Sequence, residues 1–159
     1  MKKILKIAFV IISIFFVIGT YFYYQMITSS DRQEKDIKNC LDTKYITEKP
    51  SFCLEKNSNI EIFKINIELI RNNKLIKDTL LNENIENRNQ YLIFNIPFNK
   101  FLKTDIVIVK TKNQSYKISG FDHSSDVGHW GIFGYFGDNN CYFDYDKIKI
   151  NDKKYIGIK

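Results

Sequence analysis

The run from Ile7 to Ile27 limits the fold of this chain more than any other feature of its sequence. It contains no charged residue, and only Ser13, Thr20 and Gln25 interrupt its apolar side chains as clearly polar residues. A bilayer core about 30 Å thick needs about 20 helical residues, whereas the apolar part of a cleaved signal peptide is about 7–15 residues long. The length of the run therefore predicts a transmembrane signal-anchor helix over residues 7–27.

Residues on both sides of the run indicate its orientation. The preceding segment, residues 1–6, contains Lys2, Lys3 and Lys6, and basic residues favour the cytoplasmic side of a membrane. Three tyrosines at positions 21, 23 and 24 suit the opposite interface, where aromatic rings are enriched. We therefore expect a single-pass protein of the bacterial inner (cytoplasmic) membrane, with its N-terminus in the cytoplasm and its domain extracytoplasmic.

Cleavage of the segment is a second interpretation. Thr28 and Ser30 are small residues at which a signal peptidase could cut before Asp31, which would give a secreted or periplasmic protein. Both interpretations export the remainder of the chain.

The remainder suits one domain, because its length allows a single hydrophobic core. We expect a stalk over residues 28–59, in which Asp31 and Glu34 have the spacing of a helix-capping box, and a β-domain over residues 60–159. The three lysines before the anchor supply half of the net charge of +6, and the other basic residues are scattered. No basic stripe is interleaved with aromatics, so nucleic-acid binding is not expected. Abundant Ile, Lys and Asn with scarce Arg, Ala and Pro indicate an AT-rich bacterial gene.

Three cysteines would lie in an oxidising compartment, where a disulfide is the first expectation. Cys40 with Cys53 is the local pairing, and Cys141 with either of them is the alternative. The sequence alone does not determine the connectivity.

Alternating apolar residues predict the strands of the domain. The clearest strand is 60–70, where Phe63, Ile65, Ile67 and Leu69 alternate with polar residues, and Asn72-Asn73 predicts a hairpin to 74–81. Further strands are expected at 91–96, 105–110, 114–119, 141–150 and 154–158. About seven short strands predict an all-β domain, an Ig-like or transthyretin-like antiparallel sandwich.

The segment between Lys117 and Lys147 differs from the rest of the chain. It has no Lys or Arg and five aspartates, and it holds five of the seven glycines, both histidines and the only tryptophan. Glycines permit sharp turns, and amphipathic aromatics are enriched at interfaces. One interpretation is a binding surface over 121–145, and the other is a long connection whose aromatics fill the core. The candidate binding residues are Asp122, His123, Asp126, His129, Trp130, Tyr135 and Phe136.

Two histidines and two aspartates within eight positions also suggest acid–base or metal chemistry. His123, His129, Asp122 and Asp126 carry suitable donor atoms, but their spacing matches no recognised metal motif. Phosphate-binding, dinucleotide-binding and nucleophile-elbow motifs are absent, and no cofactor is expected.

Three functions therefore remain open from the sequence. The first is a membrane-anchored extracytoplasmic binding protein of a bacterial cell envelope that engages a protein partner through the 121–145 loop, with toxin immunity as one candidate role. The second is a metal-binding protein or metal-dependent enzyme using His123 and His129. The third is a structural envelope component that acts through its anchor.

Overall fold

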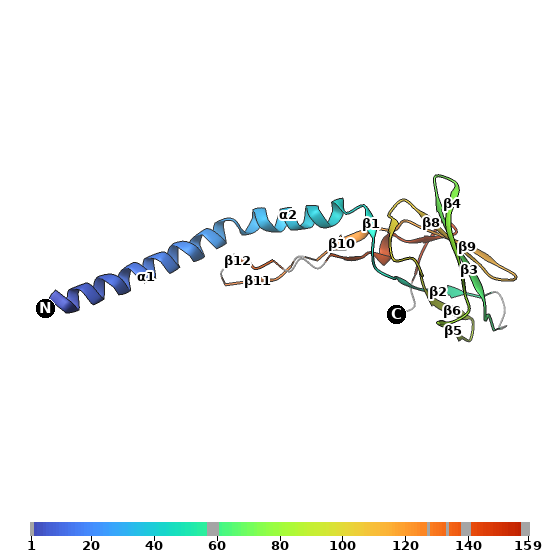
Figure 1. The fold of residues 1–159 in the computed structure, drawn as a ribbon, viewed down its shortest axis with the longest axis horizontal. Coiled ribbons are helices and arrows are strands. Elements are labelled where there is room, and N and C mark those ends of the chain that lie inside the picture. Colours follow the sequence, from blue (N-terminus) through green and yellow to red (C-terminus); the bar gives the residue numbers. More distant parts are fainter. Residues whose placement is uncertain (1, 57–60, 127, 133, 138–140, 157–159) are drawn as a thin grey trace. The chain divides into compact units, whose positions relative to one another are not determined.

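A computed structural model describes residues 2–56, 61–126, 128–132, 134–137 and 141–156 (Figure 1). These residues form two compact units. The helical unit combines residues 1–42 with 125–141, and the β-rich unit combines residues 43–124 with 142–159. The segment singled out by its composition is therefore divided between the two units.

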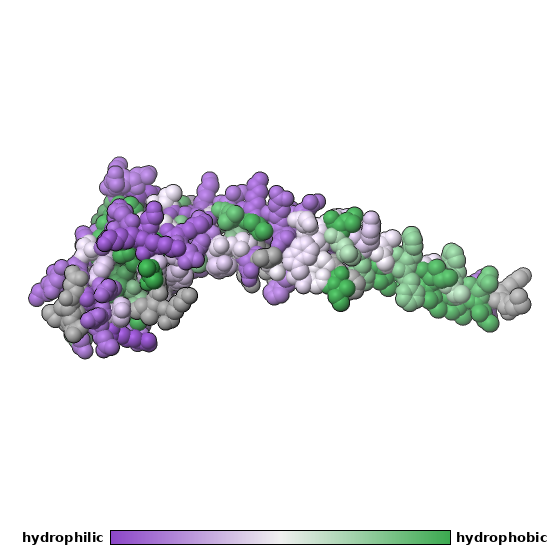
Figure 2. All heavy atoms as spheres, turned by 180° about the vertical axis from the view of Figure 1, so that it is seen from behind, coloured by the Kyte–Doolittle hydropathy of each residue, from purple (hydrophilic) through white to green (hydrophobic). Residues whose placement is uncertain are grey.

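Helix α1 (Lys2–Ile27) contains the apolar run. Its large apolar side chains are exposed, and no part of its most apolar stretch is buried inside the protein. Figure 2 shows hydrophobic residues gathered along this helix. Its length and composition suit a membrane span, and a signal sequence at this place would share both properties. The predicted N-terminal apolar helix is confirmed at that level.

Helix α2 (Ser29–Asp42) follows after Thr28. The N–H of Thr28 donates to the Tyr24 carbonyl and the N–H of Arg32 donates to the Thr28 carbonyl, each at 3.1 Å. Helical hydrogen bonding therefore continues through the junction between α1 and α2. The capping-box spacing predicted that a helix begins at Asp31, but α2 begins at Ser29 and Asp31 lies inside its first turn. A carboxylate at that position interacts favourably with the helix dipole.

A six-stranded antiparallel sheet dominates the β-rich unit, in the order β15-β14-β9-β8-β3-β4. Its strands are β3 (Ile65–Arg71), β4 (Lys74–Leu81), β8 (Ile106–Lys110), β9 (Ser115–Ser119), β14 (Lys149–Ile150) and β15 (Lys153–Lys154). Asn72 and Asn73 have φ of 51° and 61° between β3 and β4, as the predicted hairpin requires. The predicted strands 60–70, 74–81, 105–110 and 114–119 thus overlap four neighbouring strands of this sheet, β3, β4, β8 and β9.

A second sheet has the order β2-β6-β5, formed by β2 (Ser51–Glu55), β6 (Tyr91–Asn95) and β5 (Ile85–Arg88). Three two-stranded pairs complete the strands: β1 (Tyr45–Ile46) with β7 (Phe101–Leu102), β10 (His123–Ser125) with β13 (Cys141–Phe143), and β11 (Trp130–Gly131) with β12 (Gly134–Tyr135). A short 3-10 helix, η1 (Tyr145–Lys147), begins after Asp144, whose side chain accepts a hydrogen bond from the N–H of Asp146.

The two larger sheets share one hydrophobic core. Alternate residues of β3 (Ile65, Ile67 and Leu69) are buried, and they meet Phe52 and Phe94 from the second sheet in one cluster. Burying such side chains is the main favourable contribution to folding, at about 1.5–3 kcal/mol for each fully buried large aliphatic or Phe side chain. The core therefore lies wholly within the β-rich unit.

The architecture agrees with the predicted fold class in its antiparallel strands and its N-terminal helix. The grouping of strands differs from a single sandwich of about seven strands, because the described strands form two larger sheets and three small pairs. The expected stalk contains β1 and β2, at residues 45–46 and 51–55, and Phe52 and Leu54 of β2 are buried. The predicted strand 141–150 is divided by η1. Parts of the predicted strands 60–70 and 154–158 lie outside the described residues.

Candidate functional site

The hairpin formed by β11 and β12 is the central part of the segment that its composition singled out. Trp130 pairs with Tyr135 and Gly131 pairs with Gly134. Gly134 has a φ of 97°, and a Cβ at this position would overlap the Ser29 side chain and meet the Met26 Cα. The glycine is therefore required both by the backbone conformation and by the close approach of the hairpin to the helices.

Tyr135 fixes the hairpin to the helices at two points. Its backbone N–H donates to Oγ of Ser29, and its hydroxyl donates to Oδ2 of Asp36, each at 2.9 Å. Ser29 and Asp36 are seven residues apart, so they lie on the same face of α2. Tyr135 is only 2 % exposed, and Ser29 is also buried. This tyrosine was a candidate binding residue, but the structure places it in a structural contact.

A disulfide links the same helix to the end of this segment. Cys40 is bonded to Cys141, with their Cα atoms 5.5 Å apart. The first-choice pairing of Cys40 with Cys53 is therefore wrong, and the alternative with Cys141 is correct. Cys53 is a free thiol in β2. Cys40 does not pair with Cys53 because Cys40 lies on α2 in the helical unit, whereas Cys53 lies on β2 in the β-rich unit.

Three large apolar side chains of the hairpin remain exposed. Trp130 is 49 %, Ile132 is 89 % and Phe136 is 60 % exposed. The ring of Trp130 lies against the ring of Tyr135, with centroids 6.0 Å apart. Backbone hydrogen bonds of His129 with Phe136 and Gly137 extend the hairpin. His129 is exposed. Asp126 is also exposed. Of the candidate binding residues, Asp126, His129, Trp130 and Phe136 are the exposed ones.

Asp122 lies between two lysines in the β-rich unit. Its carboxylate is 2.7 Å from Nζ of Lys103 and 2.7 Å from Nζ of Lys147, and it accepts the His123 N–H at 2.8 Å. Partial burial alone would raise the pKa of Asp122, but the hydrogen bonds from both lysines and from His123 hold it well below its usual range. The carboxylate is thus charged and fully engaged in holding neighbouring elements together.

His123 is buried and pairs with a carboxylate that the sequence analysis did not select. Its Nε2 lies 3.1 Å from Oε1 of Glu48, and its Nδ1 is buried without a hydrogen-bond partner among the described residues. Partial burial alone would raise the pKa of Glu48. Backbone hydrogen bonds and the His123 imidazole have the larger effect, so the pKa of Glu48 is below its usual value. Burial and the short distance to Glu48 make this a structural contact of the β-rich unit.

The metal hypothesis gains no support from this arrangement. Within the described part of the chain, no three side chains of His, Cys, Asp or Glu are grouped to hold a metal ion. His123 belongs to the β-rich unit and His129 to the helical unit. The Asp122 carboxylate is occupied by two lysines.

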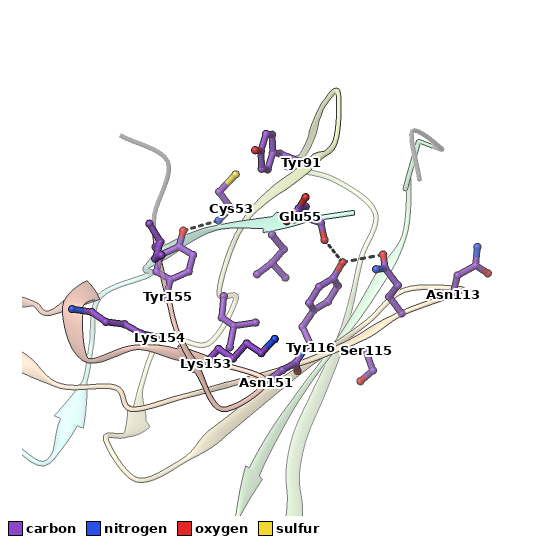
Figure 3. Close-up of a pocket in the computed structure, with 14 residues that line it drawn as sticks. Cys53, Glu55, Tyr91, Asn113, Ser115, Tyr116, Asn151, Lys153, Lys154 and Tyr155 are labelled. Atoms are coloured by element: carbon purple, nitrogen blue, oxygen red, sulfur yellow. Dashed lines mark hydrogen bonds between the residues drawn. The ribbon is translucent and has the colours of Figure 1, made fainter. Parts of the chain in front are cut away.

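An open groove of about 870 Å³ lies beside β2 in the β-rich unit (Figure 3). Tyr155 accepts the Cys53 N–H through its hydroxyl at 3.1 Å, and the Tyr116 hydroxyl donates to the Glu55 carbonyl at 2.6 Å. These hydroxyls cover the strand edge that β6 leaves unpaired. Tyr91, Lys153 and Lys154 also line the groove. Tyrosine, amide and lysine side chains line the groove together with apolar side chains and one acidic residue, Glu55. The two lysines outnumber the single carboxylate, so the lining carries a small positive charge and suits a polar ligand with negative charge.

Several residues that form these sites could not be found from the sequence. Ser29 and Asp36 are separated from Tyr135 by 106 and 99 residues, and Glu48 is separated from His123 by 75. The aromatic and glycine density distinguishes the segment from the rest of the chain. It gave no information about which of its residues are buried.

The sequence matches no protein-family model, and comparisons with curated proteins and with solved structures find no match. Function is therefore inferred from the sequence and from the geometry of the described residues.

Proposed function

We propose that this chain is a membrane-anchored, extracytoplasmic interaction protein of a bacterial cell envelope. The observation that carries this proposal is α1, whose apolar stretch Lys3–Ile27 has no buried part. An exposed apolar surface of this size is unfavourable in water and favourable in a bilayer. At about 1.5 Å per residue the helix is long enough to cross a hydrocarbon core of about 30 Å.

The disulfide supports an exported location for the rest of the chain. Cys40–Cys141 would persist in an oxidising compartment and would be reduced in the cytoplasm. The basic residues Lys2, Lys3 and Lys6 precede the helix, which favours a cytoplasmic N-terminus. Charge and disulfide therefore support the same topology.

The contacts of Ser29 favour an anchor that is retained. Cleavage before Asp31 would remove Ser29, whose Oγ accepts the buried N–H of Tyr135. A buried N–H left without an acceptor costs about 1–3 kcal/mol. The helical unit is therefore complete only when α1 and α2 remain one chain.

A topology experiment tests this proposal. The full chain is fused at its C-terminus to alkaline phosphatase, which is active only after export, and the mass of the membrane-bound product is measured. We expect active enzyme, resistance to carbonate extraction and a product that retains residues 2–30. A fusion lacking residues 2–27 is the control and should stay inactive. A product that begins at Asp31, or an inactive full-length fusion, would contradict the proposal.

The groove beside β2 is the surface that we assign to a protein partner. Lys153 and Lys154 lie at its rim on an exposed edge strand, and Tyr91 adds an aromatic surface of the kind enriched at interfaces. We expect an acidic, extended segment of an envelope or exported protein, and toxin immunity is one role that would use such a contact.

Paired substitutions test this assignment. Photo-crosslinking from position 154 in cells should yield a discrete protein adduct, and Lys153→Glu should weaken it strongly. Lys149→Glu is the matched control, because Lys149 is exposed on β14 but does not line the groove. Equal adduct formation in both variants would exclude the groove as the binding surface.

A further inference from the structure

The exposed tip of the β11–β12 hairpin lies beside the end of the apolar helix. Gly134 approaches the Met26 Cα and the Ser29 side chain so closely that a Cβ would overlap the serine. The apolar run ends at Ile27, and Ser29 lies about 3 Å farther along the helix at about 1.5 Å per residue. In a chain anchored by α1, Gly134 of the hairpin is therefore level with the membrane surface.

The tip carries the side chains that a membrane interface accepts. Trp130, Ile132 and Phe136 are all exposed, and the stretch 128–137 contains no Lys, Arg, Asp or Glu. Tryptophan is enriched at the headgroup level because its ring is apolar while its N–H can meet water. A surface loop with these residues and no charge is unfavourable in water but suits the boundary between headgroups and acyl chains.

The hairpin is held in this place by three attachments. Tyr135 donates to Ser29 and to Asp36, and the Cys40–Cys141 disulfide joins the end of the segment to α2. These attachments follow one another along α2, so the hairpin lies along the helix, and β12 also contacts the end of α1 near Met26 (Figure 1). The contact with the membrane surface therefore needs no rearrangement of the helical unit.

We propose that the β11–β12 hairpin is a second membrane contact. Its exposed residues Trp130, Ile132 and Phe136 enter the interfacial layer on the side of the membrane where α1 ends. This inference rests on the proposed anchoring by α1. The partner is the lipid of the same membrane, because the tip is apolar, uncharged and fixed beside the end of the span. With two contacts, α1 is fixed in its rotation about its own axis as well as in its depth.

Fluorescence of Trp130 tests the inference directly, because it is the only tryptophan of the chain. The full chain is reconstituted into vesicles of phosphatidylethanolamine and phosphatidylglycerol, and its emission is measured with lipids brominated near the headgroup and with aqueous iodide. We expect blue-shifted emission, strong quenching by brominated lipid and weak quenching by iodide. Strong iodide quenching without quenching by the lipid would overturn the inference.

Two variants separate a lipid contact from other effects. Ile132→Glu places a charge at the tip and should reduce the quenching by brominated lipid by more than half. Ile76→Glu is the matched control, because Ile76 is an exposed isoleucine of β4 in the β-rich unit, and it should leave the quenching unchanged. Equal quenching in both variants would contradict the inference, as would a photo-crosslinker at position 132 that captures a protein instead of lipid.

Carbonate extraction distinguishes the two proposals. If α1 does not anchor the chain, the protein leaves the vesicles and the proposed function fails. If the chain stays in the vesicles while Trp130 is exposed to water, only the hairpin contact fails.

Discussion

The core of the β-rich unit buries its aromatic rings, whereas the β11–β12 hairpin of the helical unit leaves Trp130 and Phe136 exposed. In the β-rich unit, Phe52 is 1 % exposed and its ring lies against the rings of Phe94 and Phe121. In the helical unit, Trp130 and Phe136 are exposed, and the hairpin that carries them is held by hydrogen bonds and a disulfide. Burial of apolar area stabilises the first unit. Polar and covalent attachments stabilise the hairpin and leave its apolar surface available.

The largest effect should come from opening the core of the β-rich unit. Phe52→Ala removes a fully buried ring, and the cavity should lower the free energy of unfolding by about 3–5 kcal/mol. The measurement is denaturant unfolding of the full chain in detergent, followed by circular dichroism. Phe63→Ala is the control, because Phe63 is 68 % exposed. Equal losses in the two variants would show that this core does not stabilise the unit.

Loss of the disulfide should act on the hairpin more than on the sheets. Replacing Cys40 and Cys141 together by serine should cost about 2–4 kcal/mol, because the bond closes a long loop. Chymotrypsin cleavage at the aromatic residues of 128–137 should become much faster than in the native chain. Cys53→Ser removes only a free thiol and should leave the rate unchanged. An unchanged rate in the double variant would mean that Tyr135 alone holds the hairpin.

Two glycines allow a finer test of the close approach between hairpin and helix. Gly134→Ala introduces both an unfavourable positive φ and an overlap with Ser29, whereas Gly137→Ala has the same backbone problem without any atom near its Cβ. The positive φ costs about 1–2 kcal/mol in each variant. Hydrogen exchange at the Tyr135 N–H should therefore be faster in Gly134→Ala than in Gly137→Ala. Equal exchange would show that the approach to α2 is looser than the contacts indicate.

The smallest effect should be the acid sensitivity that Asp122 confers on the β-rich unit. Its pKa is lowered in the folded chain, so its ion pairs stabilise the fold above the unfolded value of about 4 and are lost as the pH falls toward the lower folded value. Asp122→Asn should cost about 1 kcal/mol or less at neutral pH and should flatten the fall in stability below about pH 4. Unfolding midpoints at several pH values measure this. An identical pH profile in the variant would contradict it.

The sequence predicted correctly those helices and strands that depend mainly on neighbouring residues. The apolar run predicted α1, and the alternation of apolar and polar residues, together with the Asn72-Asn73 turn, predicted β3 and β4. These signals need no information about distant residues. Strands such as β1 and β7 are two residues long and exist through their pairing with each other, so no period reveals them.

The candidate site shows the same limit more clearly. Composition identified the segment 121–145, yet Tyr135 and His123 are buried while Trp130 and Phe136 are exposed. Burial of Tyr135 depends on α2, about one hundred residues earlier in the chain. A disulfide between cysteines 101 residues apart is equally invisible to local patterns.

The Cys40–Cys141 bond also determines what becomes of the protein after proteolysis. The chain between the two cysteines, which includes most of the β-rich unit, is a closed covalent ring attached to α2 at both ends. A single cut anywhere in that ring leaves both new ends joined to α2. If α1 anchors the chain as proposed, release of the domain by such a cut also requires reduction of the disulfide.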